Sequence, residues 1–227
     1  MTLYSVGWNR QFLMMREFGF VYDSSMAAPP SDPPIWPYTL DYKMPHKCLG
    51  DRQCPSRSFP GIWEMPLNQI RMEDYSCAMV DSCPHYFSEN ELVEILKSNF
   101  QRHYNSNRAP LGLYFHTIWF RGESGRKNRR AFRRFLDDMV KRQDVWIVSN
   151  WEAIQWMRQP TPQSQMTTFP PWNTCTDPTP LEKQACNIPR VCKLFSRELR
   201  KERYLYTCKE CPQTYPWIKN EFGLEFK

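Results

Sequence analysis

Two polar residues follow short apolar runs and could take part in chemistry. Asp23 follows residues 20–22, and His116 follows residues 113–115. Runs of this kind are typical of strands, and α/β proteins collect their functional groups at the carboxyl ends of strands. A histidine at such a position can transfer a proton near neutral pH. A structural histidine held by a hydrogen bond gives the same pattern, so the residue alone does not decide the function.

The histidines give no metal signature. The chain has four of them, and no two stand at the spacing of a metal-binding pair: His46, His85, His103 and His116. The patterns HExxH, GxSxG, GxGxxG and the phosphate-binding loop are absent. The residues by themselves therefore predict no metal ligands in this chain.

The nine cysteines indicate an oxidising compartment. They are Cys48, Cys54, Cys77, Cys83, Cys175, Cys186, Cys192, Cys208 and Cys211. The last four could form a zinc site, but such sites usually use two short Cys-x-x-Cys spacings and only one spacing here is short. We expect disulfides, with small loops at 48–54 and 77–83. The leftover cysteine would pair with one outside this chain.

The pattern of apolar residues predicts alternating strands and helices. We expect strands at 20–22, 62–70, 111–115 and 145–148, and a long ordered loop over 27–61. A helix over 9–18 should end at Gly19, and a helix face is predicted over 132–140. Capping boxes, in which a serine precedes a glutamate by three residues, predict two further helices that start at Ser88 and at Ser149. This alternation predicts an α/β fold with a parallel sheet.

Composition limits the class of protein. The chain has 227 residues, of which 41% are hydrophobic, which suits one domain with a small appendage. No apolar run reaches the ~18 residues of a membrane span. The net charge is +6, and much of the excess lies in residues 126–134. We interpret that segment as the solvated face of an amphipathic helix, and we expect no nucleic-acid partner because no RNA-binding platform accompanies it.

Several longer motifs carry a specific resemblance. They are Val6-Gly7-Trp8-Asn9-Arg10, Asp23-Ser24-Ser25-Met26, Ile35-Trp36-Pro37-Tyr38-Thr39-Leu40, Ala78-Met79-Val80-Asp81-Ser82-Cys83, Leu113-Tyr114-Phe115-His116 and Tyr215-Pro216-Trp217-Ile218-Lys219-Asn220. Together they resemble the insect and arthropod chitin deacetylases, which belong to the polysaccharide deacetylase (NodB-homology) family. The resemblance extends over nearly the whole chain.

The resemblance implies a fold and an activity. The fold would be a distorted (β/α) barrel, with residues 1–172 as the C-terminal part of the barrel and 173–227 as a cysteine-rich tail packed on it. Family members use a divalent metal, usually zinc, to remove acetyl groups from the N-acetylglucosamine units of chitin. His116 would be the general acid, Asp23 a second catalytic residue, and Leu113 part of the pocket for the acetyl methyl group. Trp36 is our best candidate for stacking on a sugar ring.

The chain also departs from the family pattern. The motifs that supply the catalytic base and the metal ligands do not occur in it, and neither does the arginine that usually pairs with the aspartate at Asp23. We therefore expect an N-terminally truncated, inactive fragment that lacks the zinc ligands. Family and cysteines imply secretion, although no signal peptide is visible in this chain. The alternative is a non-catalytic chitin-binding protein that organises the cuticle or peritrophic matrix.

Overall fold

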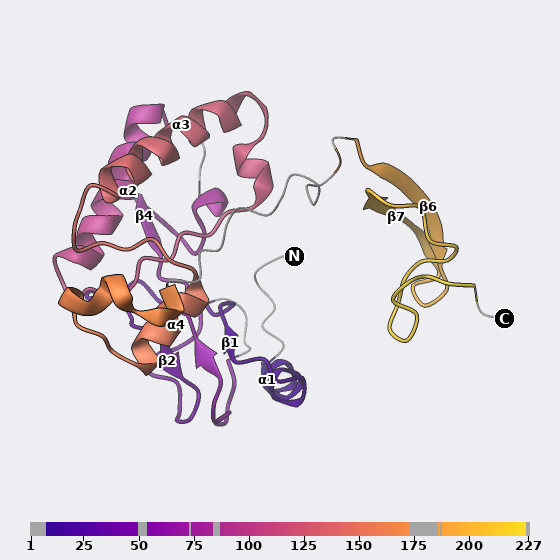
Figure 1. The fold of residues 1–227 in the computed structure, drawn as a ribbon, viewed down its shortest axis with the longest axis horizontal. Coiled ribbons are helices and arrows are strands. Elements are labelled where there is room, and N and C mark those ends of the chain that lie inside the picture. Colours follow the sequence, from indigo (N-terminus) through magenta and orange to yellow (C-terminus); the bar gives the residue numbers. More distant parts are fainter. Residues whose placement is uncertain are drawn as a thin grey trace. The chain divides into compact units, whose positions relative to one another are not determined.

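The protein is represented by a computed structural model that describes residues 8–49, 54–72, 74–83, 87–172, 186 and 188–225. The chain divides into two compact units, Met1–Thr174 and Cys175–Lys227. Figure 1 shows the helices and short strands of the first unit and the β-hairpin of the second. The assignment of these units as barrel and packed tail stays a prediction.

Four α-helices lie in the first unit, and they confirm the helices expected from the sequence. They are α1 (Trp8–Glu17), α2 (Glu89–Tyr104), α3 (Gly122–Met139) and α4 (Asn150–Arg158). The Oγ atoms of Ser88 and Ser149 each accept a hydrogen bond from the backbone N–H three residues later, at 3.3 Å. Both capping boxes are therefore present. Gly19 follows α1 with a positive φ of 71°, a conformation that glycine adopts without strain.

The sheets of the first unit are smaller than predicted. One sheet has the order β1 (Tyr22–Asp23), β3 (Trp63–Glu64), β2 (Tyr38–Thr39). β1 pairs with β3 in parallel, but β2 pairs with β3 antiparallel. β4 (Ile70–Met72) and β5 (Tyr75–Cys77) form a separate antiparallel pair. The described helices and strands together make a mixed α and β fold. Barrel closure stays a prediction.

Two of the predicted strands are not strands in the structure. Residues 111–115 and 145–148 are extended, but they belong to no β-ladder within the described part of the chain. Both segments line a cavity of about 500 Å³.

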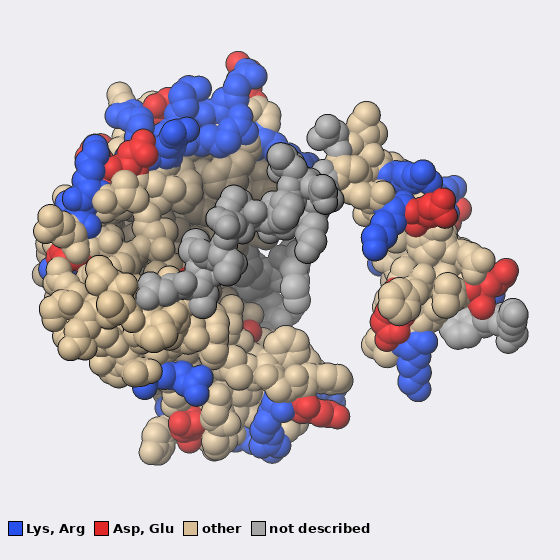
Figure 2. Space-filling view, in the orientation of Figure 1, with Lys and Arg blue, Asp and Glu red and all other residues tan. Residues whose placement is uncertain are grey.

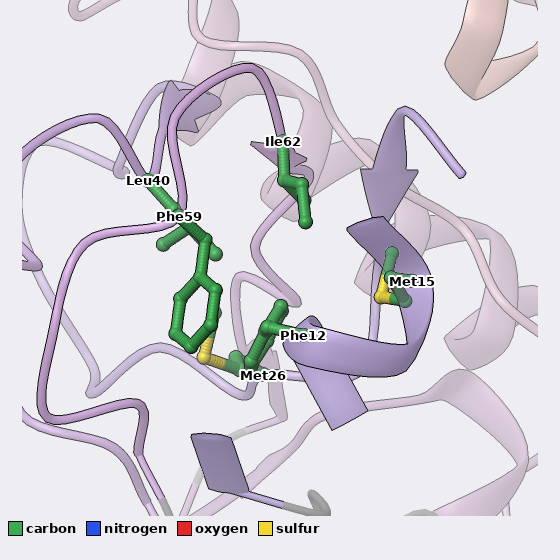
Figure 3. Close-up of a cluster of buried hydrophobic side chains, with 6 residues drawn as sticks. All are labelled: Phe12, Met15, Met26, Leu40, Phe59 and Ile62. Carbon is green, nitrogen blue, oxygen red and sulfur yellow. The ribbon is translucent and has the colours of Figure 1, made fainter. Parts of the chain in front are cut away.

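Apolar side chains from α1 and from the loops after β1 and β2 form one core cluster. Phe12 and Met15 of α1 pack with Met26, Leu40, Phe59 and Ile62, and all six are at most 5% exposed (Figure 3). This cluster fixes α1 against the sheet that carries Asp23. A second layer joins α2 to α3 through Leu96, Phe100, Phe135 and Met139.

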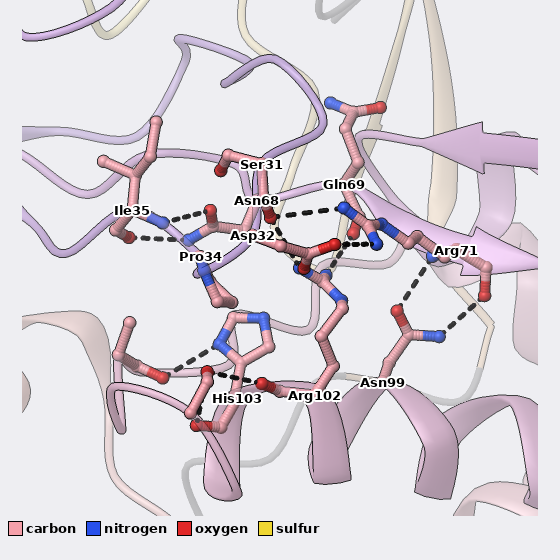
Figure 4. A network of polar contacts seen from close by, with 12 residues as sticks. Ser31, Asp32, Pro34, Ile35, Asn68, Gln69, Arg71, Asn99, Arg102 and His103 are labelled. Atoms are coloured by element: carbon pink, nitrogen blue, oxygen red, sulfur yellow. Dashed lines mark hydrogen bonds and ion pairs between the residues drawn. The ribbon is translucent and has the colours of Figure 1, made fainter.

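A polar network ties the loop after β1 to β4 and α2 (Figure 4). Asp32 forms an ion pair with Arg71 at 2.5 Å, and its other oxygen lies 3.8 Å from Arg102. The side chain of Asn99 bonds both the N–H and the C=O of Arg71. Asn68 bonds both backbone groups of Ile35 in the same way. The long loop expected over 27–61 is thus held in one conformation here, with β2 inside it.

The second unit contains one antiparallel hairpin, β6 (Arg190–Ser196) and β7 (Lys201–Thr207). Disulfides Cys186–Cys208 and Cys192–Cys211 hold it. In the first unit, Cys48–Cys54 and Cys77–Cys83 form the two small loops expected from the spacing. The preference for disulfides over a zinc site is confirmed for these eight cysteines. Cys175 and His85 lie outside the described residues.

None of the helices in the described part of the chain is both long and apolar enough to cross a membrane.

Candidate active site around His116 and Asp23

His116 lies at the N-cap of a short 3₁₀ helix, residues 117–120. Its backbone is extended, with φ −86° and ψ 150°, but the preceding segment is not a strand, so the predicted strand-end position is corrected. The side chain is 47% exposed. An imidazole at this position is accessible to a ligand while its backbone is fixed.

Asp81 holds His116 at two points. One oxygen, Oδ2, lies 2.6 Å from His116 Nδ1 and also accepts the His116 backbone N–H at 2.8 Å. The Asp81 side chain is only 5% exposed, and its buried Oδ1 has no hydrogen-bond partner among the described residues. Because a carboxylate accepts hydrogen bonds, Nδ1 carries a proton and Nε2 is left for other chemistry.

Asp23 is the last residue of β1, as the sequence predicted. Its Oδ1 accepts hydrogen bonds from Gln11 Nε2 and Ser25 Oγ, both at 3.0 Å. Its Oδ2 accepts the Ser25 backbone N–H at 3.0 Å. Three donors from the chain fix this carboxylate, although none of them is a cation.

Glu64 stands beside Asp23 in the parallel register of β1 and β3. It is fully buried, and its Oε1 accepts the Met26 backbone N–H at 3.2 Å. Burial, followed by the negative charge of Asp23, raises the pKa of Glu64 well above its ordinary value. Its Oε2 has no partner among the described residues that donates a hydrogen bond. Burial therefore favours the neutral form of Glu64 beside the Asp23 carboxylate.

Tyr38 of β2 is the neighbour of Glu64 on the other side of β3, and its hydroxyl contacts His46. Tyr38 pairs with Glu64 in the antiparallel register of β2 and β3. His46 Nδ1 lies 2.8 Å from the Lys47 carbonyl, which can only accept, so its Nε2 accepts the Tyr38 hydroxyl at 2.8 Å. Burial, Glu64 and Asp23 together raise the pKa of Tyr38 above its ordinary value.

Leu113 lines the cavity of about 500 Å³ between residues 110–113 and 144–150. It is half-buried and packs against two core clusters. His116, Asp23 and Trp36 do not line this cavity. The cavity walls near Leu113 are mostly apolar, as a pocket for a methyl group requires, and that role stays a prediction.

Trp36 is half-buried, and its indole N–H donates to the Asn107 carbonyl at 3.1 Å. Its ring stacks on Trp156 at 6.5 Å. These contacts fix the ring from one side, and its role in sugar stacking stays a prediction. Trp119 is 5% exposed inside a cluster of phenylalanines and is therefore a core residue.

The structure does not join the two predicted catalytic residues directly. Among the described residues, no hydrogen bond or ion pair connects Asp23 with His116. The carbonyl of Tyr114 accepts the N–H of Val80 next to Asp81, and burial raises the pKa of the Tyr114 hydroxyl to about 12.

The described residues do not fit a zinc site. They contain no group of three or more His, Cys, Asp or Glu side chains that could hold a metal ion. Eight cysteines are in disulfides, and the three described histidines bond to Asp81, Tyr38 and the Ala109 carbonyl. Any catalytic role of this chain therefore rests on its own side chains.

Asp81 and Glu64 were not predicted from the sequence as functional residues. Asp81 was part of a resembling motif, 78–83, but nothing in its spacing pointed to His116, which lies 35 residues away. Glu64 carried one usable signal, because an acid inside the apolar run 62–65 is unusual for a buried strand.

Comparisons with known proteins support the same class. Chitin deacetylase 1 of Bombyx mori is 40% identical over 230 residues, which cover 96% of this chain and 42% of the relative. Chitin deacetylase 8 of the same organism is 31% identical over 228 residues, covering 95% of this chain and 55% of the relative. No protein-family profile matches the chain. The resemblance to insect chitin deacetylases is confirmed, and the chain spans about half the length of these relatives.

Proposed function

We propose that this chain is a chitin deacetylase-like protein that supplies the general acid for removal of N-acetyl groups from N-acetylglucosamine units of chitin. The observation that carries the proposal is the pairing of an exposed imidazole, His116, with a buried carboxylate, Asp81, at 2.6 Å. The names of the two silkworm relatives support the reaction class. The substrate would be a polymer of β-linked N-acetylglucosamine.

The chemistry of amide hydrolysis explains the arrangement. The amine is a poor leaving group until it receives a proton. His116 can give that proton from Nε2, because Nδ1 is held by Asp81. Asp81 orients the imidazole for this transfer, because its Oδ2 contacts both His116 Nδ1 and the His116 backbone N–H. Leu113 would contact the acetyl methyl group, and Asp23 would be held in place by Gln11, Ser25 and the neutral Glu64.

We also propose that this chain corresponds to the C-terminal portion of a distorted (β/α) barrel and is inactive alone. The chain spans 42% and 55% of the two relatives, so half of such a protein would lie outside it. Zinc would be the cofactor of the complete protein, and the metal would polarise the amide carbonyl. Its ligands and the catalytic base would come from outside the residues described here. The four disulfides support an extracellular location.

A chimera tests the proposal. This chain would replace the matching region of Bombyx mori chitin deacetylase 1, and acetate release from chitin oligomers would be measured. We expect acetate release from the chimera and none from the isolated chain. Acetate release by the isolated chain would overturn the inactive-fragment proposal. A folded, zinc-loaded chimera without activity would overturn the assignment to deacetylation.

The second candidate function is a non-catalytic chitin-binding protein of the cuticle or peritrophic matrix. The lack of a metal-binding group among the described residues favours it for this chain as it stands. It predicts that the isolated chain binds chitin without releasing acetate, and that the replacement His116→Asn leaves this binding unchanged. Loss of chitin binding in that variant would argue against it.

A further inference from the structure

The exposed face of α3 carries a row of arginines. Residues 121–134 contain seven lysines and arginines, six of them arginine, against a single acid, Glu123. Arg126, Arg130 and Arg133 are spaced by four and three residues, so they lie along one face of the helix. We call these three residues the arginine stripe. Figure 2 shows Lys and Arg side chains gathered at the top of the view, where Figure 1 places α3.

The stripe points away from the core. The opposite face of α3 buries small and apolar side chains, namely Gly125, Asn128, Ala131, Phe135 and Met139. Arg126 and Arg133 are exposed, and the Arg130 side chain is 62% exposed. Packing of α3 on α2 therefore does not need Arg126 or Arg133.

Most neighbouring cations have internal partners, but two members of the stripe have none. The carboxylate of Glu89 lies 2.7 Å from Arg130 Nε and 3.2 Å from Arg134, one turn further along the helix. Lys127 and Arg129 donate to backbone carbonyls at Phe87 and Phe120. Arg126 and Arg133 form no hydrogen bond, ion pair or ring contact with any described residue.

Repulsion among these arginines destabilises the folded protein. Like charges three or four residues apart on a helix repel each other and destabilise it. A surface that only provides solubility mixes both signs of charge. Glu89 offsets part of the repulsion at one end of the stripe, and the rest is uncompensated within the described residues. A ligand of opposite charge would remove it.

We propose that the arginine stripe binds an acidic segment of another protein, with carboxylates seated on Arg126 and Arg133 as the Glu89 carboxylate is seated on Arg130 and Arg134. Arginine favours this ligand because its planar fork matches a carboxylate. The second unit is a poor candidate, since residues 186–225 contain eight lysines and arginines against five glutamates. No aromatic side chain interleaves the exposed stripe, so stacking on nucleic-acid bases has no support there.

Binding of poly-L-glutamate to the purified chain tests the proposal. The double variant Arg126→Glu/Arg133→Glu should weaken binding about tenfold or more, because contact carries a strong electrostatic component. The control Lys43→Glu/Lys47→Glu makes the same change in net charge on exposed loop residues. It should weaken binding less than about twofold, since distant exposed charges are screened by salt. Neither variant should melt below the parent chain, and the stripe variant should melt at the same or a higher temperature because the change removes like-charge repulsion.

Three results would overturn the proposal. The first is an absence of poly-L-glutamate binding by the parent chain at low salt. The second is an equal loss of binding in the stripe variant and the control variant, which would mean that only net charge matters. The third is tighter binding of heparin or polyuridylate than of poly-L-glutamate at the same salt concentration, which would assign the stripe to another class of polyanion.

Discussion

Asp23 and Glu64 are register partners across β1 and β3, and burial raises the pKa of Glu64 well above its ordinary value. Glu64 is fully buried, while Asp23 is partly exposed and accepts three hydrogen bonds. Two carboxylates at this separation cannot both ionise at low cost, so the buried one keeps its proton. This asymmetry makes stability depend on pH in a direction that can be tested.

Replacing Glu64 by Gln should make the protein more stable at alkaline pH. The folded protein holds a proton on Glu64 that the unfolded chain releases, so the free energy of unfolding falls as the pH rises above the ordinary pKa of glutamate. Glutamine keeps the shape and removes this loss. The melting temperature of Glu64→Gln minus that of the parent should increase from pH 5 to pH 8. The exposed replacement Glu94→Gln is the control, and an equal increase there would contradict the assignment.

His103 should produce the opposite dependence. It is 2% exposed, and burial lowers its pKa to about 4. The unfolded chain takes up this proton near pH 6.5, so the free energy of unfolding falls as the pH is lowered from 6.5 to 4, by at most about 1.4 kcal/mol per pH unit. Denaturant melts between pH 7 and 4 measure this slope. His103→Gln should reduce the slope, and an unchanged slope would exclude His103 as its source.

The disulfide Cys192–Cys211 should stabilise the second unit alone. It closes a separation of 19 residues, and loops of this size contribute about 3 kcal/mol. Replacing both cysteines by alanine should expose residues 188–225 to proteolysis and hydrogen exchange. Residues 8–172 should keep their protection, because the two units are compact separately. Retained protection of β6 and β7 would mean that hairpin pairing suffices without this bond.

Asp81 should act on the reaction through His116. In the chimera with Bombyx mori chitin deacetylase 1, Asp81→Asn should lower kcat by about 10–100-fold, because the imidazole loses the carboxylate that orients it through Nδ1. KM and melting temperature should change little, since Asp81 does not contact substrate in this account. Nitrogen NMR of His116 should show a loss of the Nδ1–H tautomer. The exposed replacement Asp137→Asn serves as the control, and equal effects on kcat would contradict a role for Asp81.

Local patterns predicted the helices well, while long-range contacts were beyond them. The capping boxes at Ser88 and Ser149 and the glycine stop after α1 are decided by residues within one turn, so they could be predicted from the sequence. The extended segments 111–115 and 145–148 could not be placed in a sheet, because strand pairing depends on neighbours distant in the chain. The partner of His116 was missed for the same reason. Asp81 approaches it only because Val80 N–H bonds the carbonyl of Tyr114.

The most direct test of the central claim is the kcat of the chimera with His116→Asn. We expect kcat for acetate release to fall by about 10²–10⁴, the usual contribution of a general acid. Zinc content, melting temperature and affinity for chitin oligomers should stay the same on the same preparation, because the loss concerns the transition state. A variant that keeps more than about a third of the parent kcat would contradict the assignment of His116 as the general acid.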